Sequence, residues 1–546
     1  MNRLISVLIG VFFSLFFLIS CGESDREDDR EIKHNNTYEP VSGDWLIYHL
    51  GSEPATLNPI TATDVYESLI NGGKVYETLT KRDNSSLEII PLLAESWEIS
   101  EDKLSFIFQL KKNIKWHDGT PFTSKDVVFS YKSIMDPKVD APHLKSYYRE
   151  LKSVEAIDDY TVKFTYLRPY FLALEFSGGM PIVPEHIFKK GNFNKNPAGR
   201  HPIGTGPYKF VEWKTGNQII LEKNEDYWKD KPKLNKIVFK IINDETVKFQ
   251  VLKKGDLDRA GLTPIQWDKQ SKTEAFNKNF NKHAYFTPNY SFIGWNQKKP
   301  FFSDKKVRRA MTHFLNRELV LKKILIDLGA IVTSPFFIKS PEYPTDIKPY
   351  EYDPQKAVEL LAEAGWIDSD SDGIRDKEGV KFEFEFLIPS GSDTGEKIAT
   401  ILKEELRKAG IVMNIRKTEW AVFTQRLNQR KFDAVTLGWS MGVESDPYQI
   451  WSSSQAESGS NFVNFKNEEA DKLIEMARTE FDRKKRIKLY RRFAEIVHEE
   501  QPYTFLFGRQ STVAVSKRFK NVTVYPLGLD LLEWFVPEPL QKYGVN

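Results

Sequence analysis

The stretch Leu93–Tyr131, LAESWEISEDKLSFIFQLKKNIKWHDGTPFTSKDVVFSY, decides how the first half of the chain folds. Its central LSFIFQL run alternates large apolar residues with polar or small ones, which is the period of a strand that buries one face. A second strand is expected to begin near Ile114. The HDGTP turn then ends it, because glycine opens the backbone and proline removes a ladder donor. A helix follows, capped by Thr123 or Ser124. None of these features is catalytic.

Length and composition narrow the classes of protein. A chain of 546 residues exceeds what one hydrophobic core usually serves, so two or more lobes are expected. Charged residues make up 28% of the chain, yet the net charge is only +2, and no basic stripe indicates nucleic-acid binding. Aromatic residues reach 13%, with 12 tryptophans, which suits a large core or a ligand groove.

The N-terminus has the pattern of an export signal. After the positive start Met1–Arg3, the segment Leu4–Ile19 is almost wholly apolar and too short for a comfortable membrane span. It ends in Leu-Ile-Ser-Cys, which resembles a bacterial lipobox, and Cys21 is the only cysteine of the chain. We therefore expect a lipoprotein signal peptide over residues 1–20 and lipidation of Cys21; a plain signal peptide or an anchoring helix are the alternatives. Residues 21–42 are charged and poor in apolar residues, so they predict a disordered tether.

Further patterns along the chain predict local structure. An apolar-periodic run is expected to form a helix from residue 64 to about Thr80, with its two glycines weakening but not ending it. The HPIGTGPY segment, residues 201–208, reads as a glycine turn that feeds a strand and a hairpin. A phosphate-binding loop would need a helix after the glycines, and a strand is expected instead. Residues 380–418 predict a strand, a helix and a second, parallel strand.

Several ordered motifs carry a family resemblance. They are LAESW followed by KWHDGTPFTSKDVVFS, then P-x-G-T-G-P-Y at residues 202–208, F-x-D-x-x-V-R-x-A at 302–310, and YDPQKA before AGW at 352–366. Together they resemble the solute-binding proteins of peptide-type ABC transporters, the family of dipeptide, oligopeptide and nickel binding proteins. The resemblance implies an α/β fold, two-lobed and periplasmic-binding-protein-like (class II), with an extra α/β subdomain in the first lobe.

The resemblance also implies how the chain is divided. Lobe I is expected over residues 43–288 and 509–546, with the inserted subdomain at about 65–198, and lobe II over 289–508. Two crossings between lobes form a hinge that allows closure over a ligand. Asp304 and Arg308 are expected as a salt-linked pair on the surface of a helix start.

The candidate ligand site centres on Gly438 and Trp439. Buried apolar strand residues lead to this pair at a strand end, where α/β sheets place ligands. In the peptide-binding relatives the Gly-Trp lies against the ligand, and an Asp three residues after the Trp pairs with the peptide amino terminus. That position is Gly442 here, so free-amine recognition is in doubt. Glu444 is the acid that would replace it, and Ser440 belongs to the same stretch.

Weaker candidates come from the resemblance as well. Thr63 and Val65 lie where relatives face the cleft, although core packing explains Val65 equally well. Trp420 matches a second aromatic of that cleft, with core packing an even alternative. Two further candidates are Gly261, which a structural turn explains equally well, and Arg426, for which a surface position is favoured over contact with a ligand carboxylate.

One acidic loop admits two interpretations. Its alternating aspartates suit a calcium loop with ligands Asp368, Asp370, Asp372 and Asp376. The twelfth position is Gly379 rather than the bidentate glutamate, and an acidic turn before a hairpin is favoured. No metal and no cofactor are therefore expected.

The export signal and the family resemblance together imply a lipid-anchored receptor in the cell envelope, on the periplasmic or extracellular face of the membrane. It would act as a monomer that captures short peptides by lobe closure and delivers them to an ABC permease, without an enzymatic activity. The alternatives are a receptor of the same family for a nickel chelate, haem or a sugar, a secreted hydrolase, or a surface adhesin.

Overall fold

The computed structural model describes residues 38–457 and 459–544. The predictions for the signal peptide, for Cys21 and for all but the end of the tether concern residues outside this part of the chain. In the part described, no helix combines the length and the apolar character that crossing a bilayer requires.

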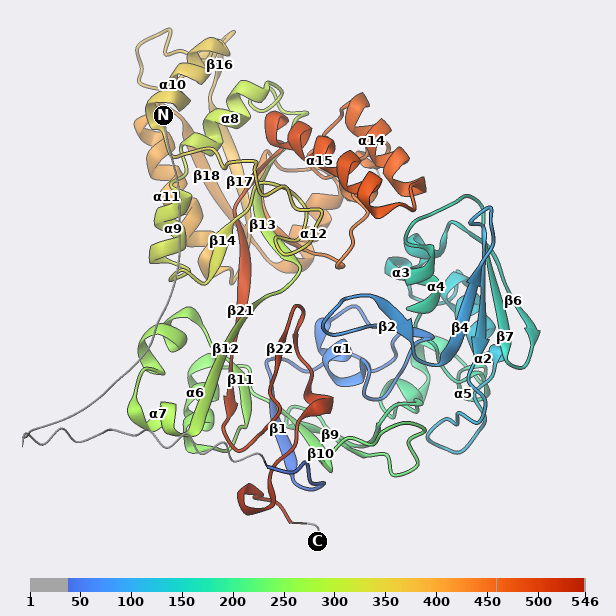
Figure 1. The fold of residues 1–546 in the computed structure, drawn as a ribbon. Helices are drawn as coiled ribbons and strands as arrows, with labels where there is room; N and C mark the ends of the chain where they lie inside the picture. The colour runs from blue at the N-terminus through green and yellow to red at the C-terminus, as the bar shows by residue number, and fades with distance from the viewer. Residues whose placement is uncertain (1–37, 458, 545–546) are drawn as a thin grey trace, which may run out of the picture. The chain divides into compact units, whose positions relative to one another are not determined.

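The largest sheet contains eight strands in the order β12-β21-β11-β1-β10-β9-β8, with β14 paired to β21 (Figure 1). Its first strand in the sequence is β1 (Trp45–Leu50), which runs parallel to β10 (Lys236–Ile241). Its remaining members are β8 (Tyr208–Lys214), β9 (Gln218–Lys223), β11 (Arg259–Gly261), β12 (Phe280–Phe286), β14 (Gly329–Ile331) and β21 (Phe507–Ser516). The predicted hairpin is thus present as β8 and β9, which pair antiparallel.

A four-stranded antiparallel sheet holds the stretch quoted first. Its order is β4 (Ala94–Ile99), β5 (Ser105–Leu110), β7 (Thr161–Tyr166) and β6 (Leu151–Asp158). Phe106, Phe108 and Leu110 are buried, so the alternation of β5 fills the core as predicted. The following helix, α2 (Ser124–Met135), starts with a capping box. In it the Thr123 side chain accepts a hydrogen bond from the Asp126 amide, and the Asp126 carboxylate accepts one from the Thr123 amide.

Two local predictions are wrong. No strand begins near Ile114; the chain makes only an isolated bridge between Lys115 and Pro121, because the Trp116 amide donates to the Thr120 carbonyl and closes a turn instead. The helix expected to reach Thr80 is α1 (Val65–Asn71), which ends at Gly72. Gly73 follows with φ of +66°, a left-handed conformation that breaks the helix rather than merely weakening it.

A five-stranded sheet carries the second half of the chain, in the order β18-β17-β19-β13-β20. Its strands are β13 (Asn289–Trp295), β17 (Glu383–Pro389), β18 (Val412–Thr418), β19 (Ala434–Ser440) and β20 (Tyr503–Phe505). The helix α11 (Asp393–Lys408) joins β17 to β18, which run parallel, so the predicted β-α-β unit is confirmed.

Helices accompany these sheets (Figure 1). Around the five-stranded sheet they are α8 (Lys305–His313), α9 (Arg317–Lys323), α10 (Pro354–Glu363), α12 (Trp420–Asn428), α13 (Tyr448–Trp451), α14 (Glu468–Thr479) and α15 (Arg483–Glu500). In the other half of the sequence they are α3 (Pro142–Tyr148), α4 (Ala173–Gly178), α5 (Glu185–Phe188), α6 (Glu245–Lys254) and α7 (Glu274–Asn279). Short strand pairs complete the fold: β2 (Thr80–Arg82) with β3 (Ile89–Pro91), β15 (Asp376–Lys377) with β16 (Val380–Lys381), and β22 (Val524–Tyr525) with β23 (Gly528–Leu529).

Arg308 is not the surface residue that its spacing to Asp304 indicates. Its side chain is buried in α8 and donates to the Glu500 carboxylate at 3.1 Å and to the Phe302 carbonyl at 2.8 Å. Asp304 instead caps the helix through the Lys306 amide. Burial lowers the pKa of Arg308 to about 10, so the guanidinium remains charged and Glu500 compensates it.

Candidate functional site

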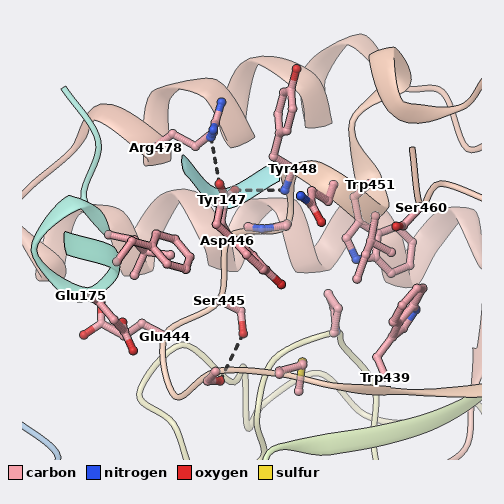
Figure 2. A pocket seen from close by; sticks show the side chains of 18 of the residues that line it. Tyr147, Glu175, Trp439, Glu444, Ser445, Asp446, Tyr448, Trp451, Ser460 and Arg478 are labelled. Atoms are coloured by element: carbon pink, nitrogen blue, oxygen red, sulfur yellow. Dashed lines mark hydrogen bonds and ion pairs between the residues drawn. The ribbon is translucent and has the colours of Figure 1, made fainter. Parts of the chain in front are cut away.

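A cavity of about 290 Å³ lies at the end of β19, at the low end of the volumes typical of ligand pockets. Its walls come from two parts of the chain, residues 147–176 and residues 290–478. Eight aromatic side chains line it: Tyr147, Tyr170, Phe176, Tyr290, Phe336, Trp439, Tyr448 and Trp451. Figure 2 shows several of them together with the polar residues between them. Such a wall suits apolar or aromatic ligand groups.

Trp439 occupies this position because β19 ends there. The preceding residues Ala434–Thr436 are buried in the middle of the sheet, and the exposed Ser440 ends the strand. The Trp439 ring stacks on Phe462 with centroids 5.8 Å apart and on Phe292 at 6.4 Å, both nearly parallel. These neighbours hold the indole in one orientation, so its contribution to the cavity wall is preorganised.

Asp446 connects the two walls. It accepts a hydrogen bond from Tyr170 Oη at 3.0 Å, and Arg478 Nε donates to it at 2.9 Å, as the dashed line in Figure 2 marks. Burial, reinforced by the Asp446 charge, raises the pKa of Tyr170 well above its usual value, so the phenol stays protonated and donates. The Phe171 amide adds a hydrogen bond to the Arg478 carbonyl at 2.9 Å.

The other acids at the cavity also have arginine partners. Glu444 accepts from Arg486 at 2.7 Å. Glu150 accepts from Arg168 at 3.0 and 3.2 Å, and Glu175 accepts from Arg82 Nε at 3.1 Å. Each carboxylate that lines the cavity is therefore neutralised within the protein.

Comparison with known proteins gives the family. The model of the bacterial extracellular solute-binding proteins, family 5 (middle region), matches residues 88–461. The chain belongs to this family. It is 34% identical over 536 residues to the oligopeptide-binding protein AppA of Bacillus subtilis, which covers 95% of this chain and 96% of that protein. It is 28% identical to the heme-binding protein A of Haemophilus influenzae, over 94% of each chain.

Solved structures agree with this assignment. AppA of Bacillus subtilis in complex with a nonapeptide superposes with a TM-score of 0.78, covering 91% of this chain and all of that one. NikZ of Campylobacter jejuni in complex with Ni(L-His), 29% identical, superposes with a TM-score of 0.77 over 90% of this chain and 99% of that one. The predicted family and the predicted two-lobed α/β fold are confirmed.

The structure places three of the predicted site residues of this family 5 protein at the cavity. These are Trp439, Ser440 and Glu444. Gly438 lies beside them within β19 but does not line the cavity; a Cβ there would come within 3.2 Å of the Tyr290 carbonyl oxygen, so the glycine permits close strand packing.

The remaining predicted positions lie elsewhere. Trp420 is 56% exposed and Val65 is 63% exposed, with Thr63 exposed beside it. Gly261 pairs with Val513 inside the eight-stranded sheet, and Arg426 forms an ion pair with Glu385. None of these five lines the cavity.

The aspartate loop brings three of its four predicted ligands together. Carboxylate oxygens of Asp368, Asp370 and Asp376 lie within 4.8 Å of one another. Asp372 instead forms an ion pair with Lys381, and Asp376 already accepts hydrogen bonds from the Ser369 amide at 2.9 Å and from the Ser369 hydroxyl. The loop leads into the β15–β16 hairpin, with Gly379 at a φ of +76° in the turn.

Sequence reasoning missed Tyr170, Asp446 and Arg478. The Asp-Pro-Tyr sequence at 446–448 and the Tyr-Phe pair at 170–171 are the local signals, because an acid and aromatics in loops commonly serve a site. Nothing in either segment indicates that they meet across 276 residues.

Proposed function

We propose that this protein is an extracytoplasmic receptor that captures short peptides and delivers them to the permease of an ABC importer. The observation that carries the proposal is the aromatic cavity at the end of β19, bridged by the hydrogen bond between Tyr170 and Asp446. The names of similar proteins support it: an oligopeptide-binding protein, and a dipeptide-binding protein of Escherichia coli at 26% identity.

In this proposal the two walls belong to two lobes, with boundaries near residues 288 and 509, and closure brings them onto the ligand. Trp439 and the other aromatic side chains contact peptide side chains. Ser440 and the main chain beside it supply hydrogen bonds to the peptide backbone. Cys21 carries the lipid that holds the receptor at the membrane, and the receptor acts as a monomer.

The receptor performs no chemistry on its ligand in this proposal. The described residues that line the cavity include serines but no histidine or cysteine, and each carboxylate there is bonded to an arginine, so the proposal assigns no pair of nucleophile and base to the cavity. The weaker candidates are receptors for haem or for a nickel chelate, which the names of two similar proteins suggest.

A thermal-shift panel tests the proposal. Peptides of two to nine residues, haem, nickel with histidine and a set of sugars are each added to the mature protein. A peptide present at 100 times its Kd stabilises the folded state by about 2.7 kcal/mol and raises the Tm by several degrees. The proposal fails if no peptide shifts the Tm, and a shift with only haem or the nickel chelate assigns the receptor to that solute.

A further inference from the structure

The carboxylates around the cavity are all paired with arginines of the protein. Four carboxylates line it, those of Glu150, Glu175, Glu444 and Asp446, and each is already bonded to an arginine of the protein. A free carboxylate is the group that recognises an ammonium ion by a charge-assisted hydrogen bond. No acid of this cavity is free in that sense among the residues that the structure describes.

The arginine partners of Glu444 and Asp446 are not easily replaced by a ligand. The side chain of Arg486 is 5% exposed and that of Arg478 is 7% exposed. An ammonium group that displaced either arginine from its carboxylate would leave a guanidinium buried without its counter-charge, which is strongly unfavourable. Arg478 is further fixed over the ring of Tyr448, with its guanidinium carbon 4.2 Å from the ring centroid.

One cation at the cavity has no such partner in the part of the chain that the structure describes. Arg149 lines the cavity and is exposed, and it forms no ion pair with any residue that the structure describes. With the other charges matched in pairs, this guanidinium is the surplus charge of the site. A planar guanidinium suits a carboxylate, which it can bind through two parallel hydrogen bonds.

One stretch of the cavity wall, at Gly442, carries no side chain. Gly442 lines the cavity, and its neighbour Glu444 points its carboxylate at Arg486 and not at a vacant partner position. The substitute acid that the sequence offers is therefore already engaged.

We propose that this receptor selects peptides by an apolar or aromatic side chain and by a carboxylate near Arg149, and that it does not require a free amino terminus. Peptides whose amino end is blocked or cyclised are then ligands as good as free ones. The inference rests on the proposed function and narrows its substrate class.

Four forms of one peptide test the proposal by calorimetry. The probe is the tightest-binding peptide of the thermal-shift panel, prepared free, N-acetylated, C-amidated and with both ends blocked. We expect acetylation to change Kd by less than about threefold and amidation to raise it about tenfold or more. An acetylated form that binds tenfold more weakly, or an amidated form that binds equally well, overturns the proposal.

Two variants locate the effect. Arg149→Gln is expected to remove the difference between the free and amidated peptides, while Lys152→Gln, which deletes an exposed charge nearby that does not line the cavity, preserves it. Loss of the difference in both variants, or in neither, contradicts the role of Arg149.

A gain of function completes the test. Gly442→Asp places an unpaired acid at the cavity and is expected to make acetylation costly by at least fivefold. Gly442→Ala controls for crowding, because a Cβ at this position lies 3.0 Å from the Glu444 carbonyl oxygen. If no peptide in the panel binds, the proposed function itself fails; if peptides bind only with a free amine, the function stands and this inference fails.

Discussion

At the scale of single residues, Trp439 is the most informative position. Its ring is partly buried against Phe292 and Phe462, so Trp439→Ala is expected to cost about 1–3 kcal/mol of unfolding free energy and to raise the peptide Kd at least about tenfold. Trp420→Ala, at a residue 56% exposed and away from the cavity, is the matched control and changes both quantities little. Urea unfolding and calorimetry measure the two effects, and equal losses of affinity would contradict the assignment of the site.

The sequence indicated part of the residue-level site and could not indicate the rest. Trp439 could be predicted as a site residue because a buried strand that ends in Gly-Trp is a local pattern in the sequence. The ion pair of Glu444 depends on Arg486 in α15, which is 42 residues away, and no spacing rule joins the two. Charge balance at a site is a property of the folded chain, so it escapes a reading of local patterns.

At the scale of elements, the turn that contains His117 makes the stability of the fold depend on pH. His117 Nε2 contacts the Gly206 carbonyl at 2.9 Å, and Nδ1 accepts from the Gly204 amide at 3.2 Å, so the ring has to be neutral to fill both roles. Burial lowers the pKa of His117 to about 4.

This low pKa predicts acid destabilisation. An unfolded histidine titrates near pH 6.5, so between pH 6.5 and 4 the unfolded chain binds more protons and the free energy of unfolding falls as the pH falls. The expected loss is about 2–3 kcal/mol, and His117→Gln should remove this share of the slope. Denaturant unfolding at a series of pH values measures it, and an unchanged slope in the variant would refute the assignment.

A buried charge cluster joins the residue before β1, the residue before β11 and the segment after β21. Arg518 donates to Asp258 at 2.6 and 2.8 Å and also contacts Asp44, and both carboxylates are essentially inaccessible. Arg518→Leu leaves two buried acids without a counter-charge and should cost about 3–5 kcal/mol. Lys517→Leu, at the exposed neighbouring position, is the control and should cost less than about 0.5 kcal/mol in the same urea titration.

The element predictions from sequence succeeded where a pattern was strong and local. The alternation in β5 and the cap before α2 each specify one conformation. They failed at Gly72 and Gly73, where two consecutive glycines end α1, and at Ile114, where the turn closes before a ladder can form. In both cases a backbone preference of a few residues outweighed the apolar period.

At the scale of the whole molecule, the proposed closure of the lobes should depend on the hydrogen bond between Tyr170 and Asp446, which bridges the cavity. Tyr170→Phe removes the hydrogen bond to Asp446 but keeps the ring, while Arg478 still neutralises the acid. A lost hydrogen bond to a charged group is worth about 1.5–3 kcal/mol, so the peptide Kd should rise roughly tenfold. Calorimetry measures the change, and an unaltered Kd would show that this bridge takes no part in closure.

The central claim is that the protein holds a peptide reversibly and leaves it intact. Native mass spectrometry of the mature protein mixed with a peptide library tests this most directly, because it reports the stoichiometry of the complex and the mass of the released peptide together. The account predicts one peptide per protein chain, released with its mass unchanged. Shortened peptides, or a protein that emerges bare from every library, would contradict it.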